Sequence, residues 1–226
     1  MASRLVKALI VGGGAAAALI LGMGSASAAG TWSVTVGSAT GTVNFNGATV
    51  GDHTPTNPDV IFTDATSGLG LSCDSATAGT PTAAGGAITV GTGQSGAPIA
   101  QIFGPATTWT HCVGPLSIEL DPTGVGTWNL QADSYASATG VTSGRITDVS
   151  AHVASPDGTS CVFDVTGSVN ATFTNSNQQL AINPDPTLNI SNVVGCFGLI
   201  NENDQASFQA IYAVSSASGN VTITSP

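Results

Sequence analysis

The residues that could perform chemistry are few and widely spaced along this chain. Ser95 lies in residues 93–97 (GQSGA), which fit the loose form of the nucleophile elbow of serine hydrolases. That turn must follow a buried strand and open a helix, so that the serine hydroxyl stands at the helix N-terminus. Pro98 follows the run directly, and no helical pattern appears beyond it. The run therefore indicates a turn between strands rather than an esterase serine.

Paired carboxylates are the second candidate, because glycoside hydrolysis needs only an acid and a nucleophile or base on opposite sides of a sugar. The chain has two glutamates, Glu119 and Glu202, which follow Cys112 and Cys196 at similar distances. This spacing does not place them in one cleft, and solvated turn carboxylates also keep a protein of low charge soluble. We assign no catalytic residue, and a carboxylate-dependent glycoside hydrolase stays open as an alternative.

Metal ligands are not clustered in the sequence. His53, His111 and His152 lie on unrelated segments without the spacing of a zinc site. Residues 183–185 (NPD) and 201–204 (NEND) carry oxygens of the kind calcium prefers, but neither forms a complete calcium loop. We therefore expect no metal and no cofactor.

Trp109 is the one candidate ligand contact. Aromatic rings can stack on a ligand, and Trp109 has no counterpart elsewhere in the chain, whereas Trp32 and Trp128 both follow a Gly-Thr pair and read as core residues. Trp109 stands close to Cys112, so packing over a disulfide is the competing interpretation.

Charge excludes several classes of partner. The chain has 3 Lys and Arg against 13 Asp and Glu, and Arg145 is the one cation beyond residue 28. A surface with one cation cannot neutralise a row of phosphates or dock on anionic lipid. We expect no nucleic acid and no anionic membrane surface as partners.

Residues 1–28 have the pattern of an export signal. Arg4 and Lys7 precede an apolar stretch at 8–24, and the small residues 26–28 (ASA) suit a signal peptidase. A membrane anchor is the alternative, but the glycines at 12–14 make the stretch weakly hydrophobic. The pattern predicts a secreted, extracellular protein that begins at Ala29.

The remaining chain, 29–226, reads as a single all-β domain. It is rich in small polar residues, and turn residues separate short alternating runs, which is typical of antiparallel sheets. The clearest strand is 161–174, where apolar and polar residues alternate throughout. A second alternating run lies at 206–214, and residues 116–120 are among the shorter candidate strands. Gly167 interrupts it and predicts a bend or bulge. We expect an antiparallel sandwich or a barrel-like architecture.

Similar landmarks recur in the same order along the chain. Gly-Thr-Trp ends at Trp32 and again at Trp128, and Ser-Cys ends at Cys73 and again at Cys161. The pattern favours two duplicated halves, 29–125 and 126–226, packed into one domain.

Repeat symmetry also favours one disulfide pairing. Four cysteines in an exported chain permit three connectivities. Matching landmarks select Cys73 with Cys112 and Cys161 with Cys196, at similar separations of 39 and 35 residues. Structural staples are the expected role, because a reactive thiolate needs a nearby cation.

Three segments carry a family resemblance: residues 30–32 (GTW), 192–201 (NVVGCFGLIN) and 223–226 (ITSP). Together they resemble a group of uncharacterised secreted, disulfide-bonded β proteins of high-GC Gram-positive bacteria. The resemblance implies an extracellular β protein and brings no activity, cofactor or catalytic residue.

The sequence thus favours a noncatalytic secreted or cell-envelope-associated protein that binds an unknown ligand or has a structural role. A glycan or an envelope component is the expected partner class. Besides the hydrolase, the long alternation at 161–174 keeps an oligomeric β-barrel pore open. Membrane strands need about 9–11 residues and girdles of aromatic residues, whereas aromatics are 5% of this chain.

Overall fold

The computed structural model describes residues 31–51, 59–73, 83–95, 98–107, 109 and 112–225. The expected signal segment, His53 and His111 lie outside these residues. No helix in the described part of the chain is both long and apolar enough to cross a membrane.

The described residues form one antiparallel sheet of 15 strands with three short 3-10 turns. The first eight strands are β1 (Trp32–Val36), β2 (Gly41–Thr49), β3 (Val60–Asp64), β4 (Gly70–Cys73), β5 (Ala83–Gln94), β6 (Ala100–Phe103), β7 (Cys112–Val113) and β8 (Glu119–Gly124). The others are β9 (Thr127–Ala136), β10 (Val141–Ala154), β11 (Cys161–Thr174), β12 (Gln179–Ile182), β13 (Leu188–Gly195), β14 (Gln205–Ser215) and β15 (Val221–Thr224). The turns are η1 (Gly104–Ala106), η2 (Pro115–Ser117) and η3 (Cys196–Gly198).

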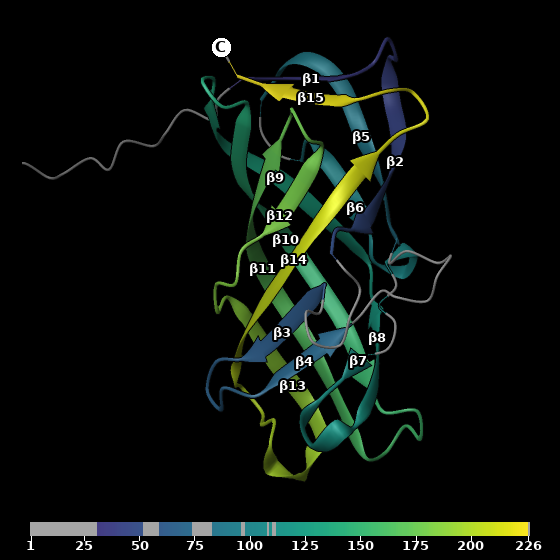
Figure 1. Ribbon diagram of the computed structural model, residues 1–226, viewed down its shortest axis with the longest axis vertical. Coiled ribbons are helices and arrows are strands. Elements are labelled where there is room, and N and C mark those ends of the chain that lie inside the picture. The colour runs from purple at the N-terminus through teal and green to yellow at the C-terminus, as the bar shows by residue number, and fades with distance from the viewer. Residues whose placement is uncertain are drawn as a thin grey trace, which may run out of the picture.

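The sheet closes on itself in two circuits that share β10, β11 and β14. The upper circuit of Figure 1 runs β14, β2, β5, β6, β9, β10, β11, β12 and back to β14. The lower circuit runs β14, β3, β4, β7, β8, β10, β11, β13 and back to β14. The predicted all-β antiparallel class is confirmed, and closure corresponds to the barrel-like form.

Alternation explains why the long strands serve both circuits. On β11, Phe163, Val165 and Phe173 are buried, while Thr166 and Asn170 are exposed. Successive side chains of a strand point to opposite faces, so one face of β11 supplies apolar residues to the interior along its whole length. The predicted face of this strand is confirmed.

The expected irregularity near Gly167 is present, but it lies on the partner strand. The β10–β11 register shifts between Ile146 and Val149, and Asp148 in between has a φ of 59°. Gly167 faces this bulge, and a Cβ there would lie 2.6 Å from the Thr187 carbonyl oxygen. Glycine is thus required at 167 because β13 approaches closely.

The top of the molecule in Figure 1 is covered by β1 and β15, which pair with each other. Val34 and Val36 of β1 and Val221 and Ile223 of β15 are buried in the core. Burial of four large aliphatic side chains fixes these two strands over the upper circuit.

The structure does not show two duplicated halves. Trp32 is the first residue of β1 and Trp128 is the second residue of β9, and both are buried, as expected. However, β1 pairs with β15 and β5, whereas β9 pairs with β10 and β6. Cys73 ends a strand and Cys161 begins one. The repeated residue pairs therefore occupy different positions in the sheet.

Candidate ligand-binding cavity

The interior of the closed sheet holds a cavity of about 60 Å³. All of its lining side chains are apolar, and they come from β3, β4, β8 to β14 and the segment before β7: Val60, Phe62, Leu71, Cys73, Trp109, Pro122, Trp128, Ile146, Val149, Ala151, Val153, Val165, Val169, Ile182, Leu188 and Phe208. Alternation sends these side chains inward, because each lining strand belongs to a closed circuit. An apolar lining of this kind can accept an apolar guest.

Aromatic rings stand where the two circuits meet. The Trp109 ring lies 6.1 Å from that of Trp128 in a stacked arrangement and 6.1 Å from that of Phe208 at 79°. Trp128 and Phe208 also line a second, smaller space of about 20 Å³ in the upper circuit. The cluster therefore separates two neighbouring apolar spaces.

One polar group adjoins this cluster from inside the sheet. The Trp109 Nε1–H donates to the Tyr212 hydroxyl at 3.3 Å, and Tyr212 lines the smaller space. Burial of Tyr212 raises the pKa of its phenol well above the ordinary value; the Trp109 hydrogen bond opposes this and the negative charge of Asp59 adds to it. The phenol stays neutral, so the group that meets the Trp109 indole is an uncharged hydroxyl.

Trp109 was the predicted ligand contact, and it does line the cavity. The competing prediction, packing beside a disulfide, is compatible with this position because Cys73 lines the same cavity. Phe208 and Tyr212 lie on the alternating run predicted at 206–214, but nothing in the sequence connected them to Trp109. Trp109 and Tyr212 are 103 residues apart, and only the closed sheet brings them together.

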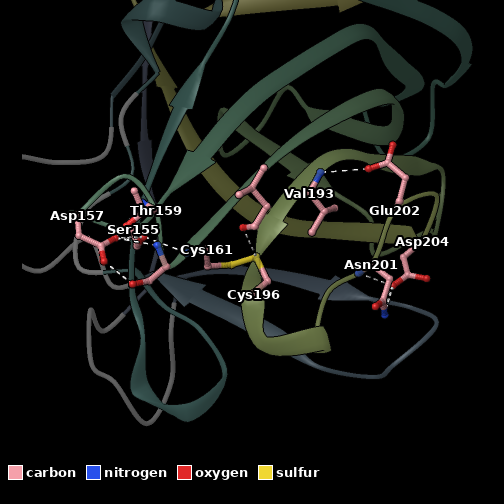
Figure 2. Close-up of a disulfide and its surroundings, with 11 residues drawn as sticks. Ser155, Asp157, Thr159, Cys161, Val193, Cys196, Asn201, Glu202 and Asp204 are labelled. Atoms are coloured by element: carbon pink, nitrogen blue, oxygen red, sulfur yellow. Dashed lines mark hydrogen bonds between the residues drawn. A yellow bond between two sulfur atoms is a disulfide. The ribbon is translucent and has the colours of Figure 1, made fainter.

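The four cysteines form the expected pairs. Cys73 is bonded to Cys112 and Cys161 to Cys196. The first bond joins β4 to β7, and the second joins the start of β11 to the first residue of η3, directly after β13 (Figure 2). Both bonds therefore lie within the lower circuit, which holds most of the cavity lining.

The two glutamates do not face each other. Glu119 is exposed at the start of β8, and Glu202 is exposed in the β13–β14 connection, where its Oε2 accepts the Val193 N–H at 3.1 Å (Figure 2). Two strands, β10 and β11, lie between β8, which begins with Glu119, and β13, to which Glu202 is hydrogen-bonded. Neither lines the cavity.

Ser95 and residues 201–204 both lie in connections that precede a strand. Ser95 is exposed directly after β5, and β6 begins shortly after it. In the turn, Asp204 Oδ2 accepts the Asn201 backbone N–H at 2.9 Å and the Asn201 amide at 3.2 Å (Figure 2). Among the described residues, no group of three or more His, Cys, Asp or Glu side chains could hold a metal.

Sequence reasoning missed one polar constellation. His152 Nδ1 lies 2.6 Å from Asp164 Oδ1, and Asp164 Oδ2 accepts the Asn192 amide at 2.7 Å. These hydrogen bonds, with that from His152 the stronger influence, lower the pKa of Asp164. His152 and Asp164 are directly paired across β10 and β11, so the hairpin register could have revealed them. They lie on the outer face, away from the cavity.

Comparison with known proteins gave no match: no family model, no curated protein and no solved structure is significantly similar to this chain. The resemblance to secreted proteins of high-GC Gram-positive bacteria therefore stays a prediction.

Proposed function

We propose that this chain is a noncatalytic extracellular binding protein that holds a small apolar molecule inside its closed sheet. The observation that carries the proposal is the cavity, whose lining is apolar throughout and includes Trp109. Ligand sites are typically concave and mostly apolar with a few placed polar groups, and the Tyr212 hydroxyl supplies such a group beside Trp109.

The extracellular location rests on two features. The signal pattern of residues 1–28 predicts export, and two disulfides are typical of oxidising compartments. An apolar lining favours an apolar envelope constituent over an unsubstituted glycan, because buried sugar hydroxyls would lack hydrogen-bond partners there.

A fluorescence titration tests the proposal. Purified protein is titrated with N-phenyl-1-naphthylamine, which becomes bright on entering an apolar site, and we expect saturable binding. Ala151→Leu is the informative variant, since Ala151 lines the cavity and three further carbons would fill part of it. We expect this variant to bind the probe at least about tenfold more weakly.

Ala154→Leu is the matched control. Ala154 lies on the same strand, and its side chain points to the outer face. Equal loss of binding in both variants, or no binding by the unaltered protein, would contradict a ligand site inside the sheet. Circular dichroism and thermal melting of each variant establish that it is folded.

A further inference from the structure

Trp109 differs from every other residue that lines the cavity. The other fifteen lining side chains lie on strands, whereas Trp109 lies between η1 and β7, outside any strand. It is also only half-buried. Pairing on both edges holds the strand residues in place, whereas no strand pairing fixes the backbone of Trp109.

The cavity is too small for a ring-sized guest while all of its lining side chains keep their positions. Its volume is about 60 Å³, compared with about 150 Å³ for an engineered apolar cavity that admits benzene. A larger guest requires one lining side chain to withdraw. Withdrawal of Trp109 would add the space of an indole between Trp128 and Phe208, two rings fixed on β9 and β14.

We propose that the Trp109 indole occupies a ring-binding slot, and that the ligand is a flat, uncharged ring compound with an N–H or O–H donor on its edge that takes the place of this indole. The inference rests on the proposed binding function and specifies its ligand class. A ligand that displaces the Trp109 indole takes over the contacts that this indole makes.

Each inherited contact restricts the ligand. Trp128 stacks on the occupant and Phe208 meets it edge-on, which favours a flat aromatic ring. The Tyr212 oxygen accepts a hydrogen bond from the occupant, so a guest without a donor would leave that buried oxygen short of a partner. An anion is disfavoured because Asp59 lies close enough for its charge to affect Tyr212, and the one described cation, Arg145, is paired with Asp133 outside the cavity.

Complementation of Trp109→Ala by free indole tests the slot. Isothermal titration should show that this variant binds indole at least about tenfold more tightly than the unaltered protein, in which Trp109 competes for the same space. Indene has the same ring shape without the N–H, and it should bind the variant roughly tenfold more weakly than indole. Equal affinities of the variant for indole and indene would overturn the proposed donor requirement.

Tyr212→Phe, added to Trp109→Ala, is the matched control. Removing the hydroxyl should abolish the preference for indole over indene while binding of both rings persists, since the aromatic contacts remain. If the preference survives, Tyr212 is not the acceptor and the assignment of the slot is wrong.

A measurement on the unaltered sequence keeps the test independent of variant folding. With 5-fluorotryptophan incorporated, saturation with indole should move the ¹⁹F resonance of Trp109 towards the solvent-exposed position and leave that of buried Trp32 unchanged. A stationary Trp109 resonance, despite saturable binding of N-phenyl-1-naphthylamine, would refute the exchange and leave the proposed binding function standing. Failure of both ligands would refute both.

Discussion

Gln178 holds the backbone of Val221 as a neighbouring strand would. Its Nε2 donates to the Val221 carbonyl oxygen at 2.9 Å, and its Oε1 accepts the Val221 N–H at 2.7 Å. Asn175 makes the same exchange with Ile223, at 2.9 and 3.0 Å. An open strand edge is a template for association with other chains, and these two amides cover the edge of β15 that β1 leaves free.

Shortening the Gln178 side chain by one methylene should lower the stability of the fold. Gln178→Asn keeps the amide, and asparagine tolerates the positive φ of 57° at this position, but the side chain is one methylene shorter and should no longer reach Val221. We expect a loss of about 1–2 kcal/mol in the free energy of unfolding, measured by urea denaturation. The nearby exposed Ser176→Ala should change stability by less than about 0.5 kcal/mol, and equal effects would argue against the edge contact.

The disulfides should contribute strongly to stability. Replacing Cys161 and Cys196 together by alanine removes a bond that closes a loop over a sequence separation of 35 residues. The chain-entropy model gives a loss of about 4 kcal/mol for such a loop, and typical measured losses are about 2–4 kcal/mol. Urea denaturation checks the magnitude. Peptide mapping of the unaltered protein without reduction should find Cys73 linked to Cys112 and Cys161 linked to Cys196, with no bond between the two pairs.

Asp157 organises the turn between β10 and β11 (Figure 2). It accepts hydrogen bonds from the hydroxyls of Ser155 and Ser160 and, at 3.0 Å each, from the backbone N–H groups of Thr159 and Ser160. These bonds, that from the Ser155 hydroxyl foremost, lower the pKa of Asp157 well below its ordinary value. The ionised carboxylate is therefore the form that stabilises the turn.

This lowered pKa predicts an acid-dependent contribution to stability. Because the pKa of Asp157 is lower in the folded than in the unfolded state, its contribution is complete above the unfolded value of about 4 and is lost as the pH falls further. Asp157→Asn should melt at a lower temperature than the unaltered protein at pH 7, and the difference should narrow below about pH 4. Glu119→Gln is the control at an exposed carboxylate. A difference that stays constant with pH would exclude ionisation as the cause.

Neither glutamate should support hydrolysis. Inverting glycosidases place their carboxyl groups about 6.5–9.5 Å apart across the sugar, and retaining ones place them closer, whereas Glu119 and Glu202 stand on strands or connections separated by β10 and β11. Panels of glycoside, ester and peptide substrates should give buffer background. Turnover of a glycan that is abolished by Glu119→Gln or Glu202→Gln would instead support the hydrolase alternative.

Polyanions should not bind. The chain has a formal net charge of −10, and Arg145 pairs with Asp133 at 2.8 Å. Like charge repels heparin, DNA and anionic vesicles. The protein should elute in the void volume of a heparin column at low ionic strength. Retention that decreases with added salt would contradict this expectation.

Local patterns predicted much of the sheet and little of its closure. The alternation at 161–174 identified β11 because one of its faces is core along the whole strand. The prediction of a strand at 116–120 is partly wrong, since Leu116 has a φ of 58° in a 3-10 turn and is 77% exposed. Strand β7 has two residues, too few for any periodicity to appear.

The candidate site could also be predicted only in part, because it depends on how the sheet closes. The types and positions of aromatic residues singled out Trp109, but a cavity exists only where distant strands close a circuit. β14 pairs with β2 and β3 in succession along one edge, over separations of more than 140 residues, and no local pattern encodes such pairing.

The sharing of β10, β11 and β14 by both circuits has a consequence for cooperativity. Neither circuit can open without removing hydrogen-bonded neighbours from strands that the other one needs, so the two ends of the molecule cannot melt separately. Amide protons in the middle of these three strands should therefore exchange only through global unfolding. Release of the proposed ligand from such an interior would proceed without strand separation, through the movement of side chains alone.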